Sequence, residues 1–345
     1  MRFVSFLYII PGFTWSCMLK RKMEEVLGML DFLGSDEQEF KAVQRRSRNL
    51  RERKCACRGE RHDITRRDLK LVLDDAVDTR PYNANFVSRV DHNGQLKLLL
   101  SEIEFLLPFK DSACTVIYAG AAPGIHIVLL AEMFENLRFV LVDPQMFAVE
   151  LSQCGNVTMH QEFMTDELAR KFKEIYTGDR LFISDVRIGP LRGVRESEEA
   201  QQTRIHEDML KQAEWFRCLD AGAGMFKFRL PWDLQTTTYL RGVIHFPIFA
   251  KKMTHESRLV VRRGDGETVY DNLKYEGQMA YFNQVLRSDM YAPTGRCFDC
   301  AAFRDIIMRF LSKSSVDAEV EMKCDSIEFN LQKLKRRWNA RRGRG

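Results

Sequence analysis

The 345-residue sequence predicts an α/β protein with an open, mostly parallel central sheet and helices on both of its faces. The clearest indication is the stretch 115–143, in which a buried strand, a small-residue loop, an apolar helix and a second strand follow one another. Strand and helix patterns continue to alternate after it, with no repeat and no long low-complexity linker. The folded region is therefore expected to be one continuous domain.

The stretch 115–143 also contains the first candidate binding site. Gly120-Ala-Ala-Pro-Gly124 is a tight loop between the first strand and the helix, and Asp143 ends the second strand. Glycines let the backbone approach a ligand closely, and a carboxylate in this position can accept both hydroxyls of an adenosyl ribose. The G-x-G-x-x-G pattern of dinucleotide folds is absent. This unit alone therefore indicates a nucleotide, S-adenosylmethionine, or no ligand at all.

The other elements follow from apolar periodicity and turn residues. Further strands are predicted at residues 156–161, 180–186, 224–229, 243–249 and 257–263. Helices are predicted at residues 94–109, 125–134, 166–176, 198–219, 272–287 and 300–312.

Charge and composition divide the chain into three parts. We predict a basic N-terminal extension at 1–79, the folded domain at 80–312 and a basic C-terminal tail at 313–345. Lys41–Lys70 contains twelve Lys and Arg residues, and Lys333–Gly345 contains seven with no acid. Such runs suit a polyanionic partner, although a solvated helix face and a disordered tail are equally consistent with them.

Residues 1–19 are apolar after one arginine, but Pro11 interrupts the run and it is short for a membrane span. A signal peptide is one alternative. We instead expect a leader that is neither a targeting signal nor a membrane segment. The nine cysteines lack regular spacing, which favours a reducing compartment, and no complete zinc motif is present, so no metal is expected.

Four ionisable residues lie in apolar or strand-like surroundings. Lys97 interrupts a leucine-rich helix, and Asp185 ends the strand at 180–186. Lys227 lies inside Met225-Phe-Lys-Phe, and Glu256 immediately precedes a strand. A buried charge is unfavourable unless it is paired, so such residues tend to meet one another or to take part in chemistry. Taken singly, each one is better explained by an isolated ion pair or an extended side chain than by chemistry.

The order Lys97, Asp185, Lys227, Glu256 resembles the K-D-K-E tetrad of RNA 2′-O-methyltransferases. The closest resemblance is to the poxvirus cap-specific mRNA 2′-O-methyltransferase family. Four stretches between residues 80 and about 311 carry it: Gly94-Gln-Leu-Lys-Leu-Leu-Leu100, Ala121-Ala-Pro-Gly-Ile-His126, Ile183-Ser-Asp-Val-Arg187 and Tyr275-Glu-x-x-Met-x-Tyr-x-Asn283. A viral enzyme and a cellular relative are both compatible with this resemblance.

The resemblance implies a Rossmann-like class I S-adenosylmethionine-dependent methyltransferase. Its expected reaction is methyl transfer to a ribose 2′-hydroxyl near the 5′ end of capped mRNA. By resemblance, Lys227 is the general base or the group that steers the hydroxyl oxygen, and both roles stay open. Because family members also serve as the small subunit of a poly(A) polymerase, a polymerase or mRNA-processing partner is expected. The expected location is the nucleus for a cellular protein and the cytoplasm for a viral one.

The resemblance also implies a set of cofactor-binding residues. Asp143 would bind the ribose, Gln145 stands where the viral enzymes have arginine, and Met164 stands where they have valine. The full set is Gln95, Tyr118, Gly120, Ala121, Ala122, Pro123, Gly124, His126, Asp143, Gln145, Met164 and Asp185.

A site for the 7-methylguanosine cap is the last implication. A cationic purine is best held between aromatic rings, with a carboxylate accepting from its N1 and N2 donors. Tyr82 and Trp232 are the candidate rings, and Asp233 and Glu276 the candidate acids. Arg187 is expected to contact RNA phosphate or to order the loop after Asp185. A core tryptophan and a surface glutamate remain alternatives for Trp232 and Glu276.

Three other functions compete with this one. A ribosomal or transfer RNA 2′-O-methyltransferase would share the tetrad but not the cap site. A non-catalytic RNA-binding subunit of an mRNA-processing complex would not need two lysines and two acids in apolar surroundings. A hydride-transferring enzyme is disfavoured because the glycine pattern of its loop is absent.

Overall fold

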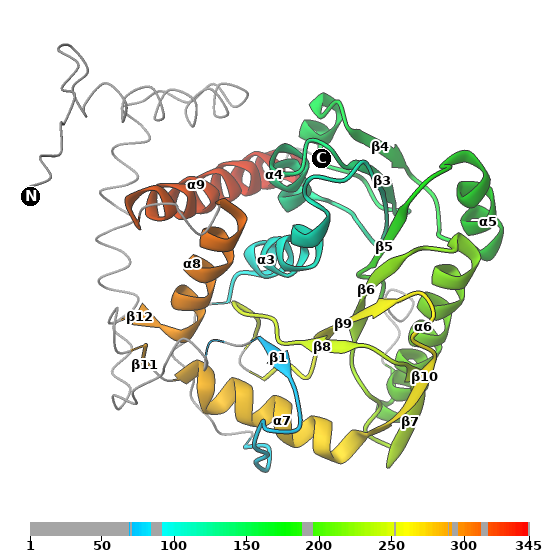
Figure 1. Ribbon diagram of the computed structural model, residues 1–345, viewed down its shortest axis with the longest axis vertical. Coiled ribbons are helices and arrows are strands. Elements are labelled where there is room, and N and C mark those ends of the chain that lie inside the picture. The colour runs from blue at the N-terminus through cyan, green and yellow to red at the C-terminus, as the bar shows by residue number, and fades with distance from the viewer. Residues whose placement is uncertain are drawn as a thin grey trace, which may run out of the picture. The chain divides into compact units, whose positions relative to one another are not determined.

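The computed structural model describes residues 69, 71–83, 92–187, 196–251, 253–288, 290–291, 296–311 and 317–343. The predicted leader and nearly all of the basic run at 41–70 lie outside these residues. Elements are labelled as in Figure 1.

An eight-stranded sheet organises the domain, with the strand order β1-β8-β9-β6-β5-β2-β3-β4. The strands from β6 to β4 in this order pair in parallel, whereas β9, β8 and β1 pair antiparallel at the other side. Their bounds are β1 (Val72–Leu73), β2 (Thr115–Ala119), β3 (Arg138–Val142), β4 (Val157–His160), β5 (Arg180–Ser184), β6 (Ala223–Phe228), β8 (Val243–His245) and β9 (Ser257–Arg262). The predicted mostly parallel sheet is confirmed.

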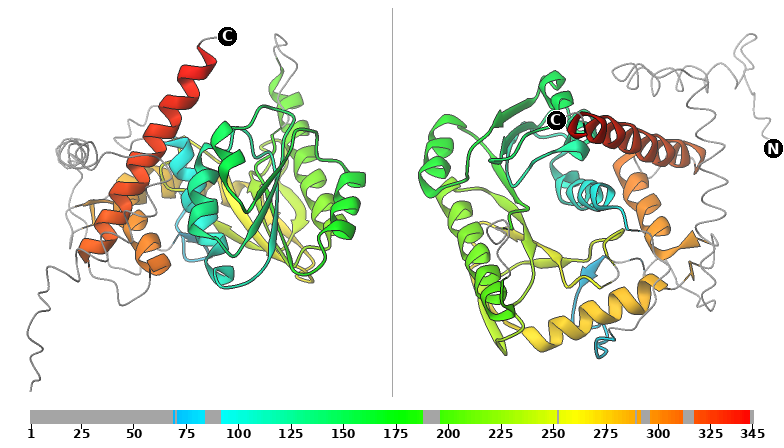
Figure 2. Two further views of the ribbon diagram at one scale, coloured as in Figure 1. Left: turned by 90° about the horizontal axis from the view of Figure 1, so that it is seen from above. Right: turned by 180° about the vertical axis from the view of Figure 1, so that it is seen from behind.

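Helices cover both faces of this sheet. Helices α5 (Asp166–Ile175) and α6 (Glu198–Leu219) lie on one face, and α3 (Gly94–Leu106) and α4 (Ile125–Met133) lie on the other (Figures 1 and 2). Both α5 and α6 begin at an N-cap side chain, Thr165 and Ser197 respectively, that accepts a backbone N–H bond. The remaining helices are α7 (Asn272–Gln284), α8 (Phe298–Leu311), α9 (Asp317–Arg342) and the short 3₁₀ helices η3 (Leu107–Phe109), η4 (Val149–Gln153) and η5 (Leu286–Ser288).

Two small ribbons were not predicted. Strands β7 (Thr236–Leu240) and β10 (Glu267–Asp271) form one, and β11 (Met290–Tyr291) and β12 (Arg296–Cys297) form the other. The first ribbon has exposed residues at alternate positions of β10, so its apolar periodicity is weak. Strand β1 was also missed, because two residues are too few to show a period. It lies inside the predicted N-terminal extension, yet it pairs with β8 at the edge of the main sheet.

The segment predicted as a basic tail contains α9, which packs against α8, α4 and α3. Val320, Cys324, Ile327, Leu331 and Leu334 are buried and recur every three or four residues, so they form one apolar stripe. Helix α4 is apolar on all sides, and such a helix needs cover on both of its sides. The sheet covers one side and α9 helps to cover the other, which is why residues 317–342 are helical.

Candidate active site

Strand register brings the four predicted catalytic residues together. Ser184 and Phe226 are paired in the parallel ladder of β5 and β6, so Asp185 emerges beside Lys227. Lys227 pairs with Arg258 in the antiparallel ladder of β6 and β9, so the residue that precedes β9, Glu256, lies at the same end. The fourth residue, Lys97, is in the first turn of α3, which covers this part of the sheet.

The side chains form a compact ion-pair network. Lys97 Nζ donates to Glu256 Oε1 over 2.7 Å. Lys227 Nζ lies 3.4 Å from Asp185 Oδ1 and 3.6 Å from Glu256 Oε2. The four side chains are between 14% and 21% exposed, so the cluster is open to a substrate while most of its surface is desolvated.

A fifth member, Arg258, was missed in the sequence. Its guanidinium is 2% exposed and lies 2.8 Å from Asp185 Oδ1 and 3.2 Å from Glu256 Oε1. It bridges the two carboxylates from the strand next to Lys227. The signal that identified Lys227, a charged residue inside an apolar strand, is equally present in Ser257-Arg-Leu-Val-Val.

The network sets the charges of its members. Burial and the neighbouring Arg258 lower the pKa of Lys97. Burial alone would raise the pKa of Asp185, but Lys227 and Arg258 outweigh it and hold that pKa below its ordinary value. The same balance, with Arg258 as the strongest cation, holds the pKa of Glu256 well below its ordinary value. Both carboxylates are therefore ionised at neutral pH.

The glycine loop lies beside this network. Gly120 has φ +79°, and a methyl group added to it would lie 2.9 Å from the backbone carbon of Asp185 and from the amide nitrogen of Val186. Gly124, with φ +69°, is the N-cap of α4. At the end of β3, Asp143 accepts bonds from Ala122 N (3.0 Å) and Gln145 N (2.8 Å). Each carboxylate oxygen has further capacity to accept.

Gln95, Tyr118 and His126 are linked through a buried glutamate. Tyr118 Oη donates to Glu102 Oε1 over 2.7 Å, and His126 Nε2 lies 3.0 Å from the same oxygen. Gln95 Oε1 accepts from the His126 backbone over 3.2 Å and lies 3.0 Å from His126 Nδ1. Tyr118 and His126 are almost fully buried, so they pack beneath the surface next to the glycine loop. Of the other predicted cofactor residues, Ala121 and Met164 are buried, Ala122 and Pro123 are partly exposed and Gln145 is exposed.

We expect Gly120→Ala to lower the free energy of unfolding by about 1–3 kcal/mol. Alanine is strained at this φ and its methyl group would collide with the backbone next to Asp185. Urea unfolding measures the loss, and calorimetric titration with S-adenosylmethionine measures the effect on the loop.

Gly266→Ala is the matched control, because Gly266 has φ +73° but no neighbour within 4 Å of an added methyl group. Gly266→Ala should lower the free energy of unfolding through backbone strain alone, because its methyl group collides with nothing. Equal losses of stability in the two variants would contradict a tight approach of the loop to Asp185.

The predicted cap residues lie around His255. The Tyr82 and His255 ring centroids are 5.0 Å apart, and those of Trp232 and His255 are 5.3 Å apart in an edge-on arrangement. Glu276 Oε1 is 3.9 Å from His255 Nε2, and the Arg229 guanidinium lies 4.1 Å from the Trp232 ring centroid. Tyr82 and Trp232 are 41% and 46% exposed, so Trp232 is not a core tryptophan.

The other two predicted RNA-binding residues differ in their surroundings. Arg187 Nη1 lies 3.6 Å from Oδ2 of the buried Asp208 on α6. Asp233 is exposed next to Trp232. Near this cluster, Met253 Sδ accepts from Gln284 Nε2 over 3.8 Å.

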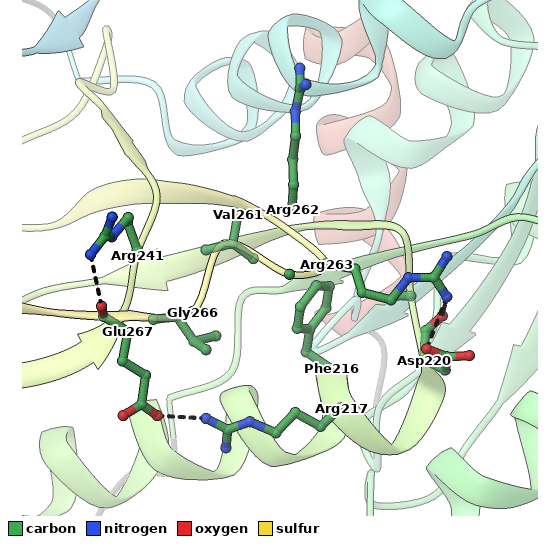
Figure 3. Close-up of a pocket in the computed structure, with 12 residues that line it drawn as sticks. Phe216, Arg217, Asp220, Arg241, Val261, Arg262, Arg263, Gly266 and Glu267 are labelled. Carbon is green, nitrogen blue, oxygen red and sulfur yellow. Dashed lines mark hydrogen bonds and ion pairs between the residues drawn. The ribbon is translucent and has the colours of Figure 1, made fainter.

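Strand β9 begins at the catalytic cluster and ends at a separate hollow of about 360 Å³, at the other end of the strands (Figure 3). Its charged residues are largely engaged with one another: Arg217 with Glu267 over 2.8 Å, and Arg263 with Asp220 over 2.9 Å. Figure 3 shows Arg262 pointing away from them. The hollow therefore offers no unpaired set of charges that would select a ligand.

The strand order reverses at β2, and in open α/β sheets ligands bind at such a point, beyond the carboxyl ends of the strands. A small-residue loop and a Lys–Asp–Lys–Glu cluster at this point define a Rossmann-like domain of the methyltransferase class. The chain belongs to the poly A polymerase regulatory subunit family, whose sequence profile matches residues 67–319.

Curated relatives agree with this assignment. The Myxoma virus (strain Lausanne) protein named cap-specific mRNA (nucleoside-2′-O-)-methyltransferase is 28% identical over 239 residues, 63% of this chain and 68% of that protein. The fowlpox virus (strain NVSL) protein of the same name is 25% identical over 177 residues, 48% of this chain and 56% of that protein. The family and enzyme class predicted from the sequence are thus confirmed.

Among solved structures, bluetongue virus VP4, described as a multifunctional RNA-capping production line, aligns with a TM-score of 0.42 and 17% identity. The alignment covers 64% of this chain and 33% of that one.

Two further points concern the residues that the structure describes. None of the helices in this part of the chain is long and apolar enough to cross a membrane. Across the same residues, no three His, Cys, Asp or Glu side chains are grouped as a metal site would require.

Proposed function

We propose that this protein transfers the methyl group of S-adenosylmethionine to a ribose 2′-hydroxyl near the 5′ end of capped mRNA. The carrying observation is the network of Lys97, Asp185, Lys227, Glu256 and Arg258 beside the glycine loop. The five charged side chains gather where β5 and β6 end and β9 begins, and a substrate can reach the four that are partly exposed. A purely structural or RNA-binding role would not require such an arrangement.

The loop residues suit the cofactor. Gly120 and Gly124 let the loop turn at positive φ and pack closely against the backbone after Asp185 and the side chain of Leu151. The Asp143 carboxylate retains lone pairs that can accept ribose hydroxyls. Gln95, Tyr118 and Met164 would border the same ligand. When bound, S-adenosylmethionine supplies an activated methyl group on a sulfonium, so the leaving group needs little assistance.

The protein's own contribution is to position the hydroxyl and to handle its proton. Asp185 and Glu256 hold Lys227 from two sides, so its amine is directed at one place. From there it would contact the 2′-oxygen, either steering it or accepting its proton. Lys97 and Arg258 hold the two carboxylates in place.

Cap recognition would use Tyr82 and Trp232 as stacking rings and Glu276 as the acceptor for guanine donors. The exposure of both rings and their shared contact with His255 support this assignment. Family membership supports a polymerase or mRNA-processing partner. We expect the protein to act where capped mRNA is made, in the nucleus of a cell or, for a viral protein, in the cytoplasm.

Three RNAs of one sequence test the proposal: one with a 7-methylguanosine cap, one with an unmethylated guanosine cap and one uncapped. Labelled methyl groups should enter the first, and mass spectrometry of nuclease fragments should map them to a 2′-oxygen close to the cap. Equal labelling of all three would reject the cap-specific reaction and favour a ribosomal or transfer RNA methyltransferase.

Helix α9 is expected to add RNA affinity that is independent of sequence. Lys335, Arg336 and Arg337 are exposed, and no acid lies near them in the sequence. Arg341 pairs with Glu150 on η4, over 3.0 Å to each oxygen, so this end of α9 is anchored near the loop that follows Asp143. Figure 2 shows the C-terminal end of α9 projecting past the helices and strands of the domain.

Replacing Lys335, Arg336 and Arg337 with glutamine should weaken RNA binding. It should also make the slope of log binding constant against log salt concentration shallower by up to about 2. Filter binding at salt concentrations between about 50 and 200 mM measures this slope. Arg170, Lys171 and Lys173, exposed on α5, are the matched control set. A slope that changes equally in both variants, or in neither, would contradict a role for α9.

A further inference from the structure

His255 is a buried histidine that the methyl-transfer chemistry does not use. It is 7% exposed, although it contacts two strongly exposed rings, Tyr82 and Trp232. Its carbonyl oxygen accepts from Tyr275 Oη over 2.6 Å, and the same hydroxyl lies 2.9 Å from Ser257 Oγ. The Tyr275 hydroxyl thereby contacts both neighbours of Glu256, the backbone of His255 and the side chain of Ser257. His255 is consequently placed with little freedom between the aromatic pair and the catalytic cluster.

The imidazole has one nitrogen without a partner. His255 Nε2 is buried and has no hydrogen bond to any described residue. Its nearest acceptor, Glu276 Oε1, is 3.9 Å away, which is too far for a hydrogen bond. An unsatisfied buried polar atom is unfavourable, so a ligand that supplies the missing partner would gain affinity.

The imidazole is also neutral. Burial and the nearby Arg229 lower the pKa of His255 to about 4. A neutral ring carries one N–H, which can be placed on Nε2, and it does not repel a cationic purine. A protonated histidine in the same position would oppose the binding of 7-methylguanine.

We infer that His255 recognises the O6 oxygen of the cap guanine through Nε2–H, next to the Glu276 carboxylate that accepts from N1–H. This assignment rests on the proposed function and names a further specificity-determining residue of the same site. The donor and the acceptor stand side by side, 3.9 Å apart, and O6 and N1–H are adjacent on the guanine edge. Adenine presents an amino donor in place of O6 and a bare nitrogen in place of N1–H, so this pair would reject it.

The test uses a cap dinucleotide, 7-methylguanosine joined by a triphosphate to guanosine, and an analogue with sulfur in place of O6. Sulfur is a weaker acceptor, so wild-type protein should bind the oxygen form about 3- to 10-fold more tightly, the effect of one hydrogen bond. In His255→Phe, which keeps a ring but has no N–H, the two ligands should bind equally. His255→Gln, which restores a side-chain N–H, should recover part of the preference.

Methylation kinetics provide a second readout. His255→Phe should raise KM for capped RNA with little change in kcat, because the histidine contacts the cap and not the reacting atoms. His245→Phe is the matched control, since His245 is a partly buried histidine on β8 outside the aromatic cluster. If the phenylalanine variant is unstable, His255→Leu supplies the same comparison with a smaller side chain.

The outcomes separate this inference from the proposed function. An unchanged preference for oxygen over sulfur in His255→Phe overturns the inference, even when methylation proceeds normally. Cap binding with the expected preference but without methyl transfer supports the inference and rejects the reaction. Wild-type protein that binds methylated and unmethylated cap dinucleotides equally rejects the selection for 7-methylguanine, whereas wild-type protein that binds the oxygen and sulfur forms equally overturns the role of His255.

Discussion

Lys227→Ala is expected to lower kcat for methyl transfer by about 10²–10⁴-fold while binding of S-adenosylmethionine and RNA stays close to wild type. The Lys227 amine lies between Asp185 and Glu256, 3.4 and 3.6 Å from their oxygens, so the variant removes the amine that both carboxylates position. Single-turnover assays with capped RNA measure the rate, and titrations with each ligand measure binding.

Lys211→Ala is the matched control for this variant. Lys211 is an exposed lysine of α6 whose nearest acid, Asp166, lies 3.8 Å away, so its loss should leave the rate unchanged. Lys227→Ala with a kcat within about threefold of wild type would reject the assigned mechanism. A parallel loss of RNA binding would instead assign Lys227 to the docking of the substrate.

The second large effect is expected for stability. Arg258→Leu should lower the free energy of unfolding by about 3–5 kcal/mol, because it removes one partner of a buried ion network. Asp185 and Glu256 would each lose their closest buried cation, and their pKa values should rise as a result. Denaturant unfolding at neutral pH measures the loss.

Because Asp185 and Glu256 have folded-state pKa values below their ordinary ones, the stability that they contribute is present above the unfolded-state pKa of about 4. It is lost progressively as the pH falls from there through the lower folded-state pKa values. The difference between wild type and Arg258→Leu should therefore narrow in acid. Arg217→Leu is the control, since the pair of Arg217 with Glu267 is half exposed and should contribute no more than about 1 kcal/mol. A loss this small for Arg258→Leu would contradict the central role of Arg258.

Much of the fold could be predicted because its elements have strong local patterns. Helices α3, α5 and α6 each begin at an N-cap side chain that is visible in the sequence, and β2 is a short run of mostly buried residues. What was missed is short or non-local. Strand β1 has only two residues, and β7 and β10 form a ribbon because they pair with each other and not because of a strong apolar pattern.

Helix α9 shows how local composition can mislead. Its final turns are basic, as expected for a tail, but the apolar stripe from Val320 to Leu334 precedes them. The composition of the segment counts all of its residues together, whereas packing depends on the apolar residues that share one face of the helix. The helices that α9 packs against include α4, almost 200 residues earlier in the chain, so only the folded structure could join the two.

For the site, the sequence alone determined which residue types were available: a glycine loop, an acid at the end of a strand, and lysines and carboxylates in apolar surroundings. These are local facts, because a charge between apolar neighbours is visible wherever it occurs. The tertiary structure decided which of them meet. Lys97 and Glu256 are 159 positions apart and share a 2.7 Å hydrogen bond, while Arg258 and His255 join their neighbours only through the register of β9 and the anchor at Tyr275. Electrostatic coupling depends on distance in space and on burial, and neither can be computed from separation along the chain.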